Sequence, residues 1–227
     1  MTLRTSRQRA PFPGFAGTSR RGGREAIGLR RFAAAALTAV LLSGAVQAAA
    51  TPVTAPSPGE MSLGDAKAPV TVIEYASVGC PHCAVWANEV FPNFRAKYID
   101  TGKARFVFRE MLTGNGALAA AGFLTARCAT SDKYFQVVDD VFAQQAQIGQ
   151  EGVEALARVA LHAGITRERF DACLRDEAAL KALNERTMAD AKEHDVTGTP
   201  TFFVNGKRLD GEQTLEDLDT AIAQARR

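Results

Sequence analysis

Cys80 and Cys83 are separated by only two residues, and they are the part of this sequence best suited to chemistry. Two thiols at this spacing can close into a disulfide and reopen, so they can exchange a disulfide with another molecule. The apolar run 70–77 just before them predicts a buried strand, and 84–90 predicts a helix. We therefore expect the first sulfur at a helix N-terminus, where free backbone N–H groups and the helix dipole stabilise a thiolate.

The two sulfurs are expected to differ in role. Cys80 is assigned as the nucleophile and the exposed end of the disulfide, and Cys83, one turn into the helix, as the buried resolving thiol. A Cys80 pKa about three units below the ambient pH would stabilise the reduced form by roughly 4 kcal/mol. That corresponds to about 90 mV of extra oxidising strength, which favours a disulfide donor over a reductant. An inert structural bridge is the alternative, although a two-residue loop at a helix start rarely serves as one.

The two residues between the cysteines have separate expected roles. His82 can stabilise the neighbouring thiolate, and the alternative is an ordinary surface histidine. Pro81 stiffens the loop and takes no part in the chemistry.

Glu74 is the acidic residue that stands out, because it lies in the middle of the apolar strand 70–77. A carboxylate is costly to bury, so a buried Glu74 should have a raised pKa. In the alternative interpretation it reaches solvent from a strand end or pairs with a Lys or Arg.

The N-terminal segment 1–48 has the pattern of a secretory signal peptide. An arginine-rich start is followed by the apolar stretch 32–42 and a small-residue cleavage site at 46–48. The apolar part is shorter than the ~20 residues that span a bilayer, so we expect no stable membrane anchor after cleavage. Sec-dependent export is favoured, and the Arg30–Arg31 pair leaves twin-arginine export as the alternative.

The remainder of the chain is long enough for one domain, or for one domain with an insertion. The formal net charge of +2 is inflated by the arginines of the signal segment, and nothing in the composition suggests nucleic-acid binding. The proline-rich segment that follows the cleavage site predicts a short linker over 49–62.

Strand patterns lie near both ends of this domain, and helical periodicity fills its middle. After the cysteines, Pro92 should kink a helix that Gly102 ends, and 104–108 predicts a strand parallel to the first. Residues 115–194 have helical periodicity. The sequence therefore predicts an α/β framework interrupted by an all-helical block.

The C-terminal part returns to strands. Asn205-Gly206 is a strong hairpin signal between the predicted strands 201–204 and 207–209, and Thr214 opens a last helix with a capping-box pattern. The predicted organisation has a first α/β part, a helical insertion and a second α/β part, at 63–112, 113–194 and 195–227.

This order, with a C-P-H-C motif at 80–83 and the sequence GTPTFFVNG at 198–206, resembles the DsbA family of exported thiol oxidoreductases. The resemblance implies a thioredoxin fold with an inserted helical domain. It also implies a cis-proline loop, Thr199-Pro200, which packs against the active disulfide and offers backbone groups to an extended peptide. One familiar form of the family has an aliphatic residue before this proline, so Thr199 leaves the strength of oxidation open.

The resemblance assigns roles to three further residues. It places Glu74 beneath the second sulfur, where the carboxyl group would shuttle the proton of Cys83. It also implies that Cys128 and Cys173 form a second, structural disulfide in the helical domain. Two buried free thiols, or a redox-active modulator, are the alternatives for that pair.

The function implied is a periplasmic oxidoreductase that donates its Cys80–Cys83 disulfide to reduced, unfolded secreted proteins through a mixed disulfide at Cys80. A DsbB-like membrane quinone reductase would reoxidise it, and we expect a monomer with no cofactor and no metal. A disulfide isomerase or reductase is the alternative, although the 49–62 segment is too short for a dimerisation domain. A copper-binding module is a weaker alternative, since no Met-rich or His-rich loop accompanies the cysteines.

Overall fold

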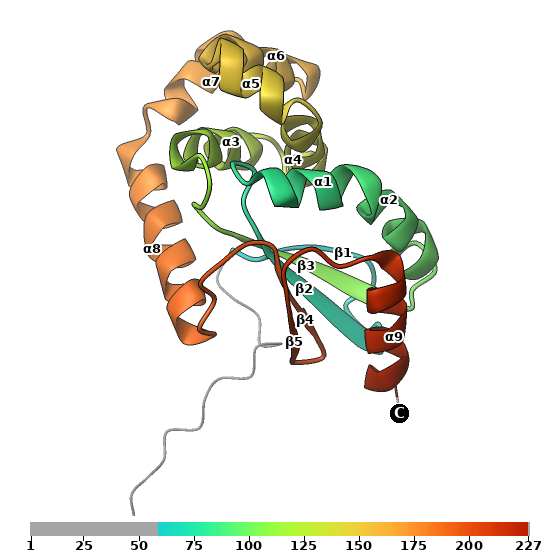
Figure 1. Cartoon of the computed structure of the whole chain (residues 1–227). Coiled ribbons are helices and arrows are strands. Elements are labelled where there is room, and N and C mark those ends of the chain that lie inside the picture. Colours follow the sequence, from blue (N-terminus) through green and yellow to red (C-terminus); the bar gives the residue numbers. More distant parts are fainter. Residues whose placement is uncertain (1–58, 227) are drawn as a thin grey trace, which may run out of the picture. The chain divides into compact units, whose positions relative to one another are not determined.

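The computed structural model describes residues 59–226, all of which fall in one compact unit. The predicted signal peptide and most of the predicted linker lie outside the described residues. A central sheet carries helices, and a block of helices lies beyond α1 (Pro81–Glu89; Figure 1). The strands are β1 (Met61–Leu63), β2 (Val70–Ala76), β3 (Ala104–Glu110), β4 (Thr201–Val204) and β5 (Lys207–Asp210).

The sheet has the order β1-β3-β2-β4-β5, with β2 and β3 parallel and every other neighbouring pair antiparallel. The parallel pair needs a crossover connection, and α1 (Pro81–Glu89), α2 (Phe91–Phe94) and the π-helical segment η1 (Arg95–Ile99) supply it. The sequence analysis missed β1, which is three residues long and begins inside the predicted linker.

The two faces of β2 are buried in different ways. Alternate residues of a strand point to opposite faces, so Val72 and Glu74 share one face while Ile73 and Tyr75 share the other. The first face belongs to the larger core, which includes buried residues of α1, α3 (Gly116–Cys128), α4 (Tyr134–Ala143) and α9 (Leu215–Ala225). The second is covered by a smaller cluster that includes Val196 and, from α8 (Glu177–Glu193), Ala191. Glu74 therefore lies on the face that carries α1.

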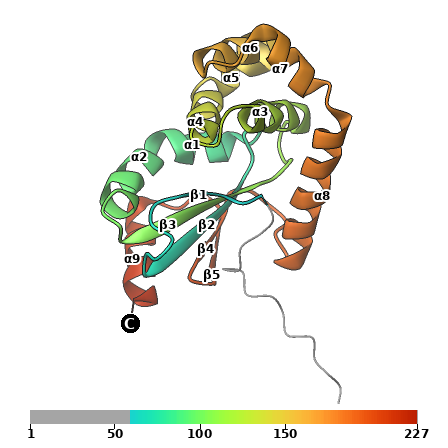
Figure 2. The ribbon, with the colours of Figure 1, turned by 180° about the vertical axis from the view of Figure 1, so that it is seen from behind.

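The predicted helical block is confirmed, and it folds against the start of α1 (Figures 1 and 2). Gly152 ends one helix of the block and begins the next. The remaining helices are α3 (Gly116–Cys128), α4 (Tyr134–Ala143), α5 (Gln145–Glu151), α6 (Val153–His162), α7 (Arg167–Leu174), α8 (Glu177–Glu193) and α9 (Leu215–Ala225).

Buried charges attach this block to the sheet. Glu110 at the end of β3 accepts hydrogen bonds from Arg127 of α3 at 2.7 Å, Tyr134 of α4 at 2.8 Å and Arg186 of α8 at 2.6 Å. A buried carboxylate needs such partners, and removing one of them would leave uncompensated charge. The network fixes the block relative to the strands that lead to the cysteines.

Candidate active site

Cys80 lies at the position that the sequence predicts, as the N-cap residue of α1 with Pro81 in the first turn. Its backbone is extended, with φ −98° and ψ 122°, and its N–H donates to the carbonyl oxygen of Ser77 at 3.0 Å. Proline suits this first turn because its missing N–H would have had no partner in the helix. The helix therefore directs unpaired N–H groups at the Cys80 sulfur.

A close backbone approach holds the loop before Cys80. The N–H of Asn115 donates to the carbonyl oxygen of Gly79 at 2.9 Å. A Cβ atom on Gly79 would lie 2.3 Å from the Asn115 oxygen, and one on Gly114 would lie 2.2 Å from the Gly79 oxygen. Only glycine fits at both positions. The helical block thereby fixes the loop that carries the nucleophile.

The block also contributes a side chain to this loop. The amide of Gln145 in α5 donates to the carbonyl oxygens of Val78 at 2.8 Å and of Cys80 at 3.0 Å. The Cys80 carbonyl oxygen also accepts from the N–H of Ala84 at 3.2 Å, so Gln145 adds a second bond there and ties α5 to the turn into α1. Gln145 was missed by the sequence analysis, because no local pattern links it to a loop 65 residues away.

The Thr199–Pro200 peptide bond is cis, as the resemblance implied. The Cys80 thiol donates to the carbonyl oxygen of Thr199 at 3.4 Å, so this loop packs directly against the first sulfur. The hydroxyl groups of Thr199 and Thr113 are hydrogen-bonded at 2.6 Å, which ties the loop to the segment after β3. Thr113 was not predicted either.

The two thiols of the pair have opposite acidities. The hydrogen bond from Cys83, the contact with Thr199 and the backbone N–H groups of Cys83 and His82 lower the pKa of Cys80 to about 5, against the effect of burial. The hydrogen bond with Cys80, burial and the charge of Glu74 raise the pKa of Cys83. At neutral pH the reduced site therefore holds one thiolate and one thiol.

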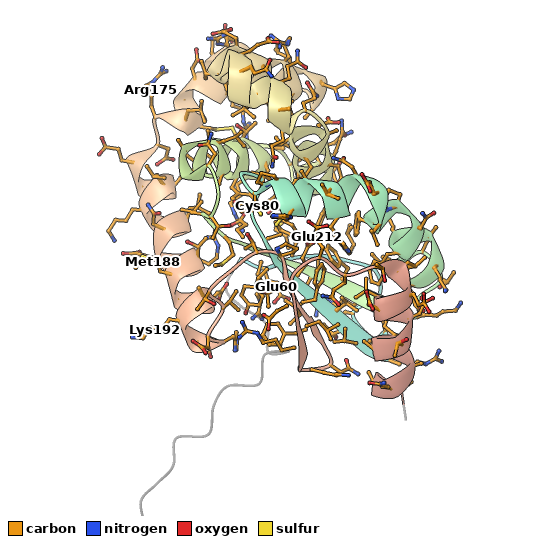
Figure 3. The ribbon with its side chains drawn as sticks, in the orientation of Figure 1. Glu60, Cys80, Arg175, Met188, Lys192 and Glu212 are labelled. Carbon is orange, nitrogen blue, oxygen red and sulfur yellow. A yellow bond between two sulfur atoms is a disulfide. The ribbon has the colours of Figure 1, made fainter. Side chains whose placement is uncertain are left out.

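The exposure of the two sulfurs differs less than expected. Cys83 is fully buried, but Cys80, predicted as the exposed end, retains only 6% of its surface. The adjacent Pro81 and His82 are exposed (Figure 3 labels Cys80 at the start of α1). A partner must therefore approach Cys80 along this exposed edge.

The expected contact between the His82 ring and the Cys80 thiolate is not observed. Nδ1 of His82 pairs instead with Oε1 of Glu212, in the loop between β5 and α9. His82 lowers the pKa of Cys80 through its backbone N–H, because the first turn of α1 directs that N–H at the sulfur while the ring projects outward. Glu212, labelled in Figure 3, is a site residue that no local pattern in the sequence points to.

Glu74 is buried, as one of the two interpretations expected, with 2% of its surface exposed. Burial, together with the charges of Cys80 and Asp139, raises its pKa well above the ordinary value. Its Oε1 atom has no hydrogen-bond partner among the described residues, so the pairing with a Lys or Arg at this atom is not observed. A neutral carboxyl group therefore lies behind the two thiols.

The second pair of cysteines is a disulfide, with Cα atoms 6.1 Å apart. It joins the end of α3 to α7, so Cys128 and Cys173 lie within the helical block. Over residues 59–226, no cluster of three or more His, Cys, Asp or Glu could hold a metal ion. None of the helices in the described part of the chain has the length and apolar character that a membrane span needs.

Comparisons with known proteins agree with this geometry. A family model described as Thioredoxin matches residues 56–224. A curated relative from Rickettsia conorii, provisionally named a protein-disulfide oxidoreductase, is 34% identical over 169 residues, which are 73% of this chain and 60% of the relative. The chain thus spans less than two thirds of that relative's length.

Two solved structures have the same fold. The crystal structure of alpha-DsbA1 from Wolbachia pipientis is 25% identical with a TM-score of 0.70, covering 78% of this chain and 96% of that one. The oxidised BdbD of Bacillus subtilis is 25% identical with a TM-score of 0.67, covering 75% and 95%.

Proposed function

Because this chain belongs to the thioredoxin family and has DsbA proteins among its structural neighbours, we propose that it is a thiol:disulfide oxidoreductase that donates the Cys80–Cys83 disulfide to other proteins. The observation that carries the proposal is the opposite acidity of the two thiols, with a Cys80 pKa of about 5 beside a Cys83 whose pKa is raised. A site of this kind favours its reduced form, because one sulfur is held as an anion.

The reaction has two displacement steps. A substrate thiolate attacks the Cys80 sulfur, a mixed disulfide forms, and the Cys80–Cys83 bond breaks with Cys83 leaving and taking up a proton. A second substrate thiolate then attacks the substrate sulfur of the mixed disulfide and releases Cys80 as a thiolate. The substrate dithiol is oxidised by two electrons, and the enzyme disulfide is reduced to one thiolate and one thiol.

The acidity of Cys80 sets the direction of this exchange. Its pKa of about 5 lies below pH 7. The reduced form therefore gains about 3 kcal/mol at pH 7 relative to a thiol with an ordinary pKa. For a two-electron couple this makes the disulfide more oxidising by about 60 mV. The direction favours a donor of disulfides over a reductant.

The surroundings of Cys80 favour a polypeptide as the substrate. The cis-proline loop lies against the sulfur, and β4 continues from it, so an extended peptide could pair with the backbone at Thr199. We propose reduced, unfolded secreted proteins as the substrates. A DsbB-like membrane quinone reductase would reoxidise the enzyme, and the predicted signal peptide would direct it to the periplasm. We also propose a monomer and roles for Cys80 as nucleophile and Cys83 as resolving thiol.

An isomerase or reductase is the second candidate, and Thr199 before the cis-proline is the observation that favours it. An isomerase attacks substrate disulfides, so it must keep Cys80 reduced in its own compartment. The redox potential separates a donor from a reductase, because a low pKa of Cys80 raises it.

The test is a glutathione redox titration of the protein without its signal segment, followed by fluorescence of the single Trp86 three residues beyond Cys83. A donor should have a potential well above the thioredoxin value of about −270 mV. It should also oxidise a reduced model protein faster than glutathione disulfide alone. A potential at or below the thioredoxin value, with no oxidation of that protein, would overturn the proposal.

A further inference from the structure

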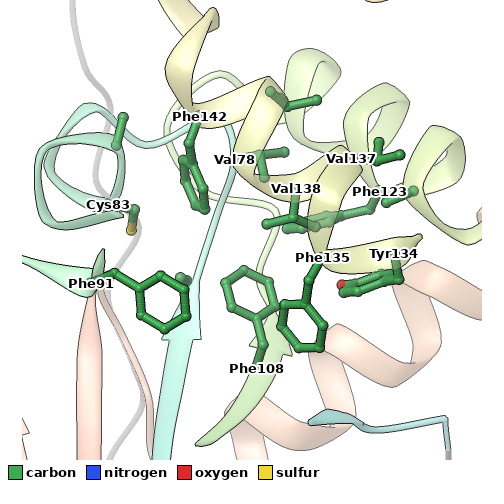
Figure 4. Close-up of a cluster of buried hydrophobic side chains, with 14 of the residues drawn as sticks. Val78, Cys83, Phe91, Phe108, Phe123, Tyr134, Phe135, Val137, Val138 and Phe142 are labelled. Atoms are coloured by element: carbon green, nitrogen blue, oxygen red, sulfur yellow. The ribbon is translucent and has the colours of Figure 1, made fainter. Parts of the chain in front are cut away.

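A small cavity adjoins Glu74, on the face of the sheet that carries α1 and α4. Its volume is about 10 Å³, on the order of the space that one water molecule needs. Most of its wall is aromatic or aliphatic, and Figure 4 shows Phe91, Phe108 and Phe135 of this wall in the same core region as Cys83. The residues with polar atoms in the wall are Glu74, Trp86 and Asp139.

Two of these residues have buried polar atoms without a partner. Oε1 of Glu74 and Nε1 of Trp86 make no hydrogen bond within the described part of the chain. A buried donor and a buried acceptor are costly to leave unpaired, and buried water molecules usually satisfy such groups. A water in this cavity could accept from the indole N–H and bond to the carboxyl group.

The third residue, Asp139 of α4, connects the cavity to the surface. It also lines a larger surface groove of about 570 Å³, together with Arg95 and the exposed Asp132. Asp139 and Phe135 line both spaces, and only the carboxyl group of Asp139 can carry a proton. Burial raises its pKa to about 6, so it can both hold and release a proton near neutral pH.

We propose that a water molecule in this cavity connects Glu74 to Asp139, and that Asp139 returns to Glu74 the proton that Glu74 gives to Cys83. The inference rests on the proposed function and adds a positioning residue, Asp139, to the thiol:disulfide exchange. It supplies a route between a carboxyl group that is 2% exposed and the solvent.

The step that needs this route is the departure of Cys83. Its raised pKa makes the thiolate a poor leaving group unless it is protonated as the sulfur–sulfur bond breaks. The neutral Glu74 donates that proton and becomes a buried carboxylate. Asp139 passes a proton through the water to Glu74 and takes up another from solvent, so no further electrons are involved.

The charges around Asp139 come from three elements. Glu74 of β2 faces it across the cavity, Arg95 of η1 lowers its pKa, and Asp140 of α4 raises it. Arg95 is itself within 3.5 Å of Asp100, and Asp140 is within 2.9 Å of His162. Asp140 does not line the cavity beside Glu74, so it offers a matched control on the same helix.

The experiment compares the wild type with Asp139→Asn and Asp140→Asn in stopped-flow reduction of the oxidised protein by dithiothreitol from pH 5.5 to 8. Rate constants are corrected for the concentration of dithiothreitol thiolate. At pH 6, Asp139→Asn should be slower by at least about fivefold, since a proton donor has been removed. The difference should shrink by pH 8, where Asp139 of the wild type is ionised.

The controls separate a proton route from a structural effect. Asp140→Asn keeps the Asp139 carboxyl group and removes only a charge that raises its pKa, so the rate should stay within about twofold of the wild type. Asp139→Glu should restore much of the pH 6 rate, and the Cys80 pKa should be the same in all variants. An Asp139→Asn protein with the wild-type pH profile would overturn the inference while the proposed function stands. If the wild type itself does not exchange with dithiols, the proposed function fails instead.

Discussion

The two cysteine pairs of this chain have the same chemical groups and opposite surroundings. Cys80 and Cys83 are two residues apart at the start of a helix, with a carboxyl group behind them and a cis-proline loop against the first sulfur. Cys128 and Cys173 are 45 residues apart and join two helices of the block. The first pair is suited to disulfide exchange, because its environment lowers the pKa of one thiol and raises the pKa of the other.

The difference shows that a cysteine pair takes its role from the groups around it. In the first pair, N–H groups of α1 and the Thr199 loop stabilise one anion, and burial keeps the partner protonated. In the second pair, the closed loop restricts the unfolded chain, which stabilises the fold without any need for reactivity. Changes at each pair should therefore appear in different measurements.

The largest effect should come from the nucleophile. Cys80→Ser should reduce oxidation of a reduced model protein to the uncatalysed rate, because serine cannot form the mixed disulfide. Cys83→Ser should instead retain Cys80 and accumulate a mixed disulfide with the substrate, since the second thiol is missing. Non-reducing gels of the reaction mixture would show that adduct. A Cys80→Ser protein with normal activity would contradict the assignment of the nucleophile.

Removal of the second pair should lower the stability of the fold and leave the redox chemistry of Cys80 and Cys83 unchanged. The double variant Cys128→Ala/Cys173→Ala opens a loop of 45 residues. The free energy of unfolding should fall by about 4 kcal/mol on the loop-entropy model. Urea denaturation of the oxidised proteins measures it, and the redox potential of Cys80–Cys83 is the control.

The potential of that variant also decides between two roles of the second disulfide. A purely structural bridge predicts the wild-type potential in any variant that is still folded. A shift of more than about 30 mV, which is about 1.4 kcal/mol, would show instead that the second pair modulates the first.

The first pair should also make stability depend on pH in one redox state only. The folded pKa of Cys80, about 5, is below its ordinary value of 9.0. The thiolate therefore stabilises the reduced form in full above pH 9, and this contribution is lost as the pH falls through about 5. Between pH 7 and 5 the reduced protein should lose about 2 kcal/mol relative to the oxidised protein.

Denaturant titrations of both redox forms at the two pH values measure this difference. The Cys80→Ser protein serves as the control, because it has no thiol at residue 80 and should lack the dependence. If the free energy of unfolding changed equally between pH 7 and pH 5 in the reduced and oxidised wild type, Cys80 would have an ordinary pKa.

The parts of the site predicted from the sequence are those fixed by local pattern. The helix start at Cys80, the burial of Glu74 within an apolar strand and the hairpin at Asn205-Gly206 all depend on neighbours in the chain. The cis bond at Pro200 came from a family resemblance. Spacing and periodicity also predicted the order of strands and helices, apart from the short edge strand β1, while the thioredoxin fold itself came from the resemblance.

The parts that were missed depend on contacts between distant segments. Gln145 reaches the Cys80 carbonyl from the helical block, and Glu212 meets the His82 ring from a loop 130 residues away. Asp139 looks like an ordinary polar position of an amphipathic helix until α4 is placed beside β2. No single-sequence pattern encodes such pairings, because they arise only when the insertion packs on the sheet.

The smallest effects should come from His82 and Glu212, and they test how the acidity of Cys80 is built. The ring of His82 pairs with Glu212, while the His82 backbone N–H acts on the sulfur. His82→Ala keeps that N–H and removes only the ring, so it should change the Cys80 pKa by less than about half a unit, or about 0.7 kcal/mol. The pKa should stay below the ordinary value, because Cys83, Thr199 and the backbone still stabilise the thiolate.

Glu212→Gln should change the exchange rate by no more than about fivefold, since exposed ion pairs contribute about 0.2–1 kcal/mol. Thiolate absorbance as a function of pH measures the Cys80 pKa in both variants. A return of the Cys80 pKa to its ordinary value in His82→Ala would show that the imidazole, and not the helix start, sets the acidity of Cys80. The contrast between the two cysteine pairs would then depend on one exposed side chain instead of the backbone of α1.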